Sequence, residues 1–144
     1  MIDYRKEFDD KGYFTCVSIL DDSEREELLS KIVQIEKNVI SYPENKKEQD
    51  PNNPSRLRKI NDLVLNNQYF LKIAKKPAIL DIVTKCIGGD IKHFGDQLFM
   101  KPPGGVEKTS HQDSPYFPIS PMNLISCWIA LDDVNEENGC MKFI

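Results

Sequence analysis

His111 and Asp113 are the two residues of this chain whose types and spacing best suit metal chemistry. The chain has two histidines in 144 residues, and His111 precedes a carboxylate by two positions in T-S-H-Q-D-S-P-Y-F. Alternate residues of a β-strand point to the same side, so both side chains can reach one metal ion while Gln112 faces away. One imidazole and one carboxylate make two thirds of the 2-His-1-carboxylate set that holds Fe(II) and leaves coordination positions open. An ordinary polar turn at the end of a strand is the alternative, and the tripeptide by itself leaves both open.

Other kinds of site do not fit the sequence. The segment P-P-G-G-V-E-K-T-S at 102–110 lacks the G-K-[ST] order of a phosphate loop. The acidic residues between 132 and 137 lack EF-hand spacing and suit an exposed hairpin. No Ser/His/Asp or Cys/His arrangement stands out. A formal net charge of -4 gives no basic field for nucleic acid or an anionic membrane, so we expect neither as a partner.

The composition is that of one ordinary globular domain, with 40% hydrophobic and 29% charged residues. The N-terminus, M-I-D-Y-R-K-E-F-D-D, lacks the apolar core of a signal peptide, and no apolar run is long enough to span a bilayer. We therefore predict a cytoplasmic protein. The cysteines show no C-x-x-C spacing and three of them lie in apolar runs, which predicts reduced, structural thiols at Cys16, Cys86 and Cys127.

The elements that must position the His-x-Asp pair begin with a predicted strand and helix. Residues 11–20, K-G-Y-F-T-C-V-S-I-L, are rich in aromatic and β-branched residues and predict a strand. Asp21-Asp22-Ser23 then offers N-cap side chains. Apolar residues recur at helical spacing from there to about residue 38, which predicts an amphipathic helix.

A breaker segment and a second helical stretch follow. Residues 41–56 hold three prolines and three asparagines among alternating charges, which predicts an exposed, mobile loop. Residues 66–87 predict helix with an interruption at Pro77, and Gly88-Gly89 supplies a stop. Residues 1–89 are thus expected to be mainly helical support.

The second half predicts strands. Short apolar runs split by Pro, Gly or Asn occupy 90–101, 111–119, 123–131 and 140–144, and Asn138-Gly139 predicts a tight turn between the last two. Helices followed by strands predict an α+β fold with a mainly antiparallel sheet or barrel over 90–144. The sequence stops in the middle of an apolar strand, so we expect a partial domain over 1–144 whose C-terminal remainder is missing. Such open strand edges would favour self-association.

The motifs around the pair resemble one family. The segments Q-L-F-M-K-P-P-G-G, H-Q-D and S-C-W-I-A-L-D-D-V-N-E-E-N-G-C-M-K-F-I resemble the phytanoyl-CoA dioxygenase family of non-haem iron, 2-oxoglutarate-dependent oxygenases. The likeness is dense over 94–144. It is looser at G-Y-F…I-L-D-D-S-E-R-E-E-L and at R-K-I-N-D-L. It implies N-terminal helices bracing a double-stranded β-helix, the jelly-roll or cupin-like core, of which this chain would hold the first strands.

The resemblance implies roles for individual residues. His111 and Asp113 would be iron ligands, and the 2-oxoglutarate pocket would be bordered by Lys59, Gln97 and Trp128. Substrate would approach at Tyr116 and Phe117. A second histidine ligand and an arginine for the distal carboxylate would lie beyond Ile144.

Each of these residues other than the pair has a structural alternative. Trp128, Tyr116 and Phe117 can be packing residues, Gln97 can satisfy a backbone group, and Lys59 sits in a basic cluster with Arg56 and Arg58. The other histidine, His93, lies upstream of the pair where the family has no ligand, so we expect a structural strand histidine.

The activity implied is hydroxylation of a small molecule that the sequence does not identify. Fe(II), 2-oxoglutarate and O₂ would be required, and succinate would be a product. Because a carboxylate stands at Asp113, where halogenating relatives carry a small residue, hydroxylation is favoured over halogenation. We expect the 144-residue piece by itself to be inactive. A cupin-like, non-catalytic module that binds a metal or ligand is the alternative.

Overall fold

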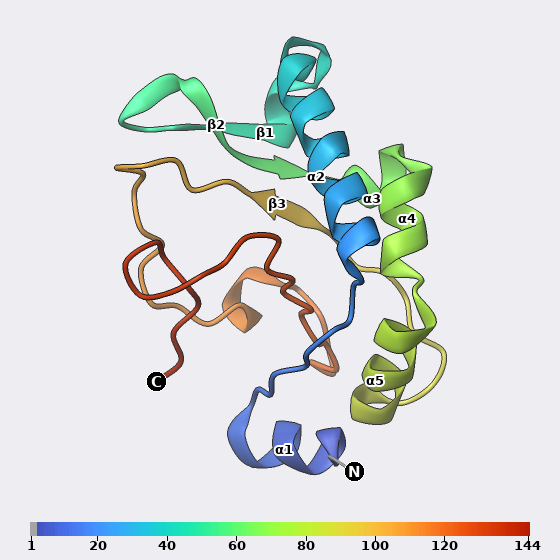
Figure 1. The fold of residues 1–144 in the computed structure, drawn as a ribbon. Coiled ribbons are helices and arrows are strands. Elements are labelled where there is room, and N and C mark those ends of the chain that lie inside the picture. Colours follow the sequence, from blue (N-terminus) through green and yellow to red (C-terminus); the bar gives the residue numbers. More distant parts are fainter. Residues whose placement is uncertain (1–2) are drawn as a thin grey trace.

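The computed structural model describes residues 3–144. Its helices and strands follow the order α1 (Tyr4–Lys11), α2 (Asp22–Lys37), β1 (Lys47–Asp50), β2 (Asn53–Asn61), α3 (Leu63–Asn66), α4 (Gln68–Ala74), α5 (Pro77–Ile87) and β3 (Gln97–Phe99) (Figure 1). Short 3₁₀ turns lie at Val39–Ser41, Glu44–Lys46 and Ser114–Tyr116. Mixed helix and sheet agree with the predicted α+β class. Among residues 3–144, no helix has the length and apolar character needed to cross a membrane.

The sheet has the order β1-β2-β3 with antiparallel pairing throughout. Strands β1 and β2 form a hairpin, so the prediction of a loop without regular structure over 41–56 was wrong. Most of this segment is exposed, as expected. Its polar residues misled the prediction because a hairpin is held by backbone hydrogen bonds, and its side chains need not be apolar where the strands face water.

Helix α2 lies where it was predicted. The Asp21 side chain accepts the backbone N–H of Glu24 at 2.8 Å, and the Glu24 carboxylate accepts the N–H of Asp21 at 3.0 Å. This reciprocal capping box satisfies N–H groups that a helix start leaves free. One face of α2 then packs on the sheet and on α3 and α4 (Figure 1), and the cluster comprises Leu28, Ile32, Ile35, Ile60, Leu63, Val64, Phe70 and Ile73.

The predicted helical stretch over 66–87 is confirmed as α4 and α5. The break falls where Pro77 begins α5, because proline lacks the N–H that a helix interior needs and suits the first turn. Gly88 follows α5 with a φ of 98°, a conformation that favours glycine, and its N–H returns to the carbonyl of Thr84. The predicted stop is therefore confirmed.

The N-terminal region differs from the prediction. Helix α1 was not expected, and of the predicted strand 11–20, Lys11 ends α1 and residues 12–20 form an irregular segment. Phe14 packs against Tyr4 and Phe8 of α1, with ring centroids 5.0 and 6.3 Å apart. Strand propensity reflects how side chains pack on a neighbouring strand, and here Phe14 packs on a helix while Tyr13 stacks on Phe143.

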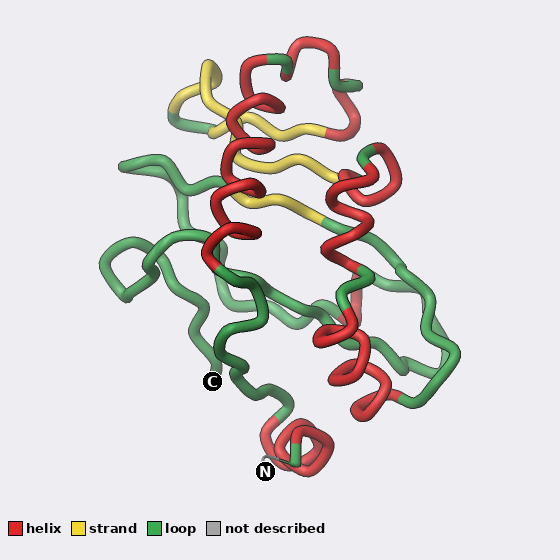
Figure 2. Tube along the Cα trace, turned by 45° about the vertical axis from the view of Figure 1, so that its right-hand side comes forward, coloured by secondary structure: helices red, strands yellow, loops and turns green. Residues whose placement is uncertain are grey.

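Most of the strands predicted in the second half are also absent from the described residues. Within 90–101 only β3 is a strand, and the runs 111–119, 123–131 and 140–144 are irregular apart from one 3₁₀ turn (Figure 2). An apolar run becomes a strand only beside a partner strand, and no such pairing forms here. A turn does form over residues 136–139, closed by bonds from the Gly139 and Cys140 N–H groups to the Asn135 carbonyl at 3.1 and 2.9 Å. It is wider than the predicted tight turn, and no strand flanks it in the described residues.

Candidate functional site

His111 and Asp113 face each other with donor atoms close together. The Nε2 atom of His111 lies 3.4 Å from Oδ1 of Asp113. The Nδ1 atom of His111 lies 2.7 Å from the carbonyl oxygen of Thr109. Because a carbonyl oxygen only accepts, Nδ1 is the donor in this contact, and Nε2 is the nitrogen left to bind a metal ion. A backbone contact of this kind orients the ring of a metal-ligating histidine.

The pair converges by a different route from the one expected. Residues 111–113 are not in a strand, so strand alternation does not bring the two side chains together. Asp113 has helical backbone angles and precedes the 3₁₀ turn Ser114–Tyr116, whose last N–H bonds the Asp113 carbonyl at 2.9 Å. Both side chains are partly exposed, at 33% for His111 and 54% for Asp113.

A divalent metal ion suits the atoms that this pair presents. An imidazole nitrogen and a carboxylate oxygen 3.4 Å apart can both lie about 2.1 Å from one ion. The donor set is nitrogen and oxygen without sulfur, which suits iron in the 2-His-1-carboxylate arrangement. Among residues 3–144, no group of three or more His, Cys, Asp or Glu side chains could hold a metal. Within the described residues, His111 and Asp113 thus offer two donor atoms to such an ion.

Of the two aromatic residues predicted on the substrate side, Tyr116 borders the pair and Phe117 does not. The rings of Tyr116 and His111 are edge-on with centroids 6.3 Å apart, and Tyr116 is 67% exposed. Phe117 packs edge-on against Phe94 at 5.0 Å. Tyr116 thus lies beside His111, whereas Phe117 packs on Phe94, which precedes β3.

Lys59 and Gln97 lie on one face of the sheet. Strand pairing places Lys59 opposite Phe99 and Asn61 opposite Gln97. Between them, Ile60 pairs with Leu98 on the face that packs into the core. Because neighbouring residues of a strand point to opposite faces, Lys59, Asn61, Gln97 and Phe99 share the face away from the core. Two residues predicted to border the co-substrate pocket are therefore brought together by register.

Lys59 already has two partners on that face. Its ammonium forms an ion pair with Glu48 of β1 and lies 5.9 Å from the ring centroid of Phe99. Only 17% of the Lys59 side chain is exposed, against 48% for Glu48. A lysine head over an aromatic face gains a cation–π attraction, so the position of Lys59 is well defined.

Asn61 is a residue of this face that the sequence interpretation missed. Its Oδ1 atom is the buried side-chain oxygen that lacks a hydrogen-bond partner in the described part of the chain. An unpaired buried acceptor is rare and calls for an explanation. Glu48 was missed as well. Alternation along R-K-I-N-D would have placed Asn61 beside Lys59 had the segment been predicted as a strand.

Trp128, His111 and Asp113 lie outside the strands that carry this face. Trp128 lies in the irregular run 123–131 and is 49% exposed. Among the described residues, no hydrogen bond or ion pair joins His111 or Asp113 to Lys59, Gln97 or Trp128.

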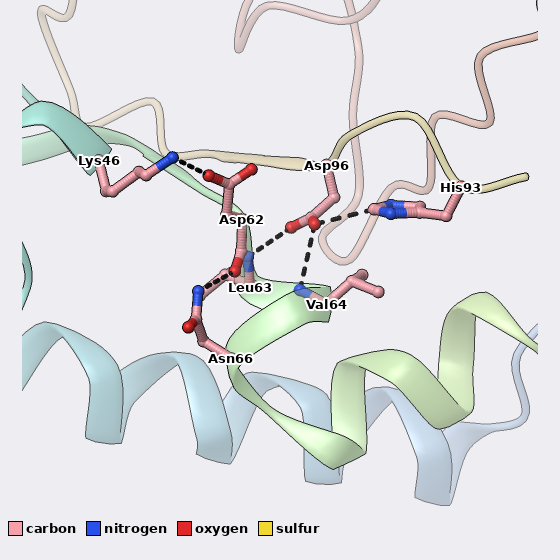
Figure 3. Close-up of polar contacts among 7 residues, drawn as sticks. All are labelled: Lys46, Asp62, Leu63, Val64, Asn66, His93 and Asp96. Carbon is pink, nitrogen blue, oxygen red and sulfur yellow. Dashed lines mark hydrogen bonds and ion pairs between the residues drawn. The ribbon is translucent and has the colours of Figure 1, made fainter.

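The other histidine has a structural environment. His93 Nε2 lies 3.6 Å from Oδ1 of Asp96. The Asp96 carboxylate also accepts the backbone N–H groups of Leu63 and Val64, at 2.7 and 3.1 Å (Figure 3). His93 therefore flanks a helix cap, in keeping with the expected structural role, although it lies in an irregular segment before β3 and not in a strand.

Comparison with known proteins identifies relatives. The family profile described as phytanoyl-CoA dioxygenase (PhyH) matches residues 8–144. The peroxisomal phytanoyl-CoA dioxygenase of Rattus norvegicus is 36% identical over 88 residues, which are 58% of this chain and 26% of that protein. A probable alpha-ketoglutarate-dependent hypophosphite dioxygenase of Stutzerimonas stutzeri is 24% identical over 142 residues, which are 95% of this chain and 50% of that protein.

A shorter match of higher identity adds to these. Phytanoyl-CoA dioxygenase domain-containing protein 1 of Danio rerio is 40% identical over 48 residues, 33% of this chain and 16% of that protein. No solved structure matches significantly. The chain spans half or less of the length of these curated relatives. Because the family profile covers nearly the whole sequence, the chain belongs to the phytanoyl-CoA dioxygenase family.

Proposed function

We propose that the full-length protein containing this chain is a non-haem Fe(II)- and 2-oxoglutarate-dependent dioxygenase that hydroxylates a small molecule. The observation that carries the proposal is the pair of donor atoms on His111 and Asp113, 3.4 Å apart. Family membership supports the same activity, and several relatives are named as dioxygenases. Small-molecule substrates, a cytoplasmic location and self-association through strand edges remain predictions.

In this proposal the chain's own residues hold and orient the reactants. His111 Nε2 and the Asp113 carboxylate would hold Fe(II), while the Thr109 carbonyl fixes the imidazole by its contact with Nδ1. Bound iron would supply the oxidising chemistry, in which O₂ is consumed and 2-oxoglutarate is decarboxylated to succinate. Lys59 would provide a positive charge for a carboxylate of 2-oxoglutarate, and Gln97 a polar group on the same face.

Trp128, Tyr116 and Phe117 keep proposed roles nearer the substrate. Tyr116 is the best placed of the three, because its ring lies beside His111 and is largely exposed. Trp128 would border the co-substrate. We also propose that the sheet face carrying Lys59 and Gln97 becomes the interior of a jelly roll in the full-length protein, while α2 and α4 brace its outer face.

Anaerobic titration of the full-length protein with Fe(II) and 2-oxoglutarate tests the function. A metal-to-ligand charge-transfer band in the visible range is expected for the wild type. The band should be lost in His111→Ala, because one of two protein ligands of this chain is removed, and retained in His93→Ala, the matched control. Absence of the band in the folded wild type would disprove the proposal and favour a module that binds without catalysis.

A further inference from the structure

Glu48 forms an ion pair with the ammonium group of Lys59, the group that we propose binds a carboxylate of the co-substrate. Strand pairing sets Glu48 of β1 directly opposite Lys59 of β2, and Lys59 in turn opposite Phe99 of β3. The three side chains therefore form one row across the sheet, whose strands lie in the order β1-β2-β3 (Figure 1). Nothing in the resemblance assigns a role to Glu48.

The two partners differ in how firmly they are held. The Lys59 side chain is 17% exposed, and its head also lies 5.9 Å from the Phe99 ring centroid. Glu48 is 48% exposed, and the ion pair to Lys59 is the contact recorded for its carboxylate within the described residues. A half-exposed carboxylate can turn into water at low cost, because hydration replaces the ion pair. Glu48 is thus the group that would leave.

A second carboxylate at Lys59 would meet a negative charge already present. Two carboxylates that share one ammonium repel each other, and the repulsion is stronger away from bulk water. An anionic ligand that reaches Lys59 must therefore displace Glu48 or bind less tightly in its presence. The Glu48 carboxylate also balances the positive charge of Lys59 when no ligand is bound.

We infer that Glu48 is a competing carboxylate that sets the affinity of Lys59 for the co-substrate's carboxylate. Glu48 holds Lys59 in the free protein and is displaced when a dicarboxylate such as 2-oxoglutarate binds. The inference rests on the proposed function, because it takes Lys59 as a co-substrate contact. With Glu48 present, the affinity of the protein for 2-oxoglutarate is lower than it would be if Lys59 had no competing carboxylate.

The experiment measures 2-oxoglutarate affinity of the full-length protein through the Fe(II) charge-transfer band. Glu48→Gln should tighten binding about twofold to fivefold, the range that one partly exposed ion pair allows. Glu48→Ser, a second neutral variant, should act in the same direction. Glu48→Asp keeps a carboxylate and should stay nearer the wild type. The tightening should shrink at high salt, which screens the competing charge.

Glu44 supplies the matched control. Its carboxylate lies 2.7 Å from Lys47 Nζ, so Glu44→Gln removes the same charge and also breaks an ion pair close by in the sequence. Its 2-oxoglutarate affinity should equal that of the wild type. In a Lys59→Met background, the effect of Glu48→Gln should vanish, because a double-mutant cycle reports the coupling between the two residues.

The outcomes separate the inference from the proposed function. If the wild type shows no band, the proposed function fails. If the wild type shows the band but Glu48→Gln and Glu48→Ser bind 2-oxoglutarate with unchanged or weaker affinity, the inference alone is overturned. It is overturned too if the tightening persists with Met at position 59 or is equalled by Glu44→Gln.

Discussion

Asp96 caps the backbone of Leu63 across 33 residues of sequence. Its Oδ2 atom accepts the Leu63 N–H at 2.7 Å, and the other oxygen accepts the Val64 N–H at 3.1 Å (Figure 3). Asp62, which directly precedes Leu63, has a left-handed backbone conformation, and its side chain forms an ion pair with Lys46. A carboxylate from the approach to β3 thus fixes the point where β2 turns into α3.

Asp96→Ala should therefore destabilise the fold. Two N–H groups lose a charged acceptor, and the cost should be about 1–3 kcal/mol in the free energy of unfolding. Urea denaturation of the full-length protein measures it. Asp81→Ala, at an exposed position of α5, is the control and should change stability by less than about 0.5 kcal/mol. Equal stability of the two variants would show that the cap contributes little.

Local signals explain which parts of the fold the sequence predicted. The start of α2 depends on Asp21 and Glu24, three residues apart, and the turn over 136–139 includes Asn138, whose Oδ1 accepts the Asn135 N–H. Such patterns carry their own hydrogen bonds, so sequence alone identifies them. The hairpin β1–β2 is harder to recognise, because its strands are polar and one of them includes Pro54, although the Asp50 side chain accepts the N–H groups of Asn52 and Asn53 in its turn.

The candidate site was predictable in its residue types and not in its arrangement. The spacing of His111 and Asp113 indicated a metal pair, but the two residues lie in an irregular segment before a 3₁₀ turn and not in a strand. That Lys59 and Gln97 share a face depends on the pairing of β2 with β3, segments that a chain of helices separates. A single sequence does not show which residues of two distant strands pair with each other.

Glu24 should give the fold a pH dependence in the acid range. The hydrogen bond from Lys76, followed by that from the Asp21 backbone, lowers the pKa of the Glu24 carboxyl. A carboxyl whose pKa is lower in the folded state stabilises the fold above its unfolded pKa, about 4.3, and loses that contribution as pH falls through the folded value. Glu24→Gln should thus lower the melting temperature at pH 7, and the difference from wild type should narrow below pH 4. A constant difference from pH 7 to pH 3 would contradict this.

Asn61→Leu should leave the melting temperature unchanged or raise it. The buried Oδ1 of Asn61 has no partner in the described residues, so an apolar side chain of similar size removes an unsatisfied acceptor without losing a hydrogen bond. Asn66→Leu is the contrast, because Asn66 Nδ2 donates to the Asp62 carbonyl at 2.7 Å. Thermal unfolding gives the melting temperatures of both variants and of the wild type. A loss for Asn61→Leu as large as for Asn66→Leu would mean that Oδ1 is bonded in solution.

Gly105→Ala should distort the loop that leads from β3 to the metal pair. A Cβ atom at residue 105 would stand 2.9 Å from the Pro102 carbonyl oxygen and 3.2 Å from Oδ2 of Asp50. Asp50 is 3% exposed, and its other oxygen accepts the Asn52 N–H at 2.7 Å, so neither neighbour can move freely. Crowding of this kind costs about 1–3 kcal/mol.

Gly95→Ala is the control for that variant. A Cβ there meets nothing within 4 Å and its φ is not positive, so stability should be equal to or slightly above that of the wild type. Urea denaturation gives the cost, and the Fe(II) and 2-oxoglutarate band reports on the pair. Because the loop ends at Thr109, whose carbonyl orients His111, Gly105→Ala should weaken iron binding even where the protein stays folded. Wild-type stability and an unchanged band in Gly105→Ala would show that the loop adapts and that His111 is positioned without it.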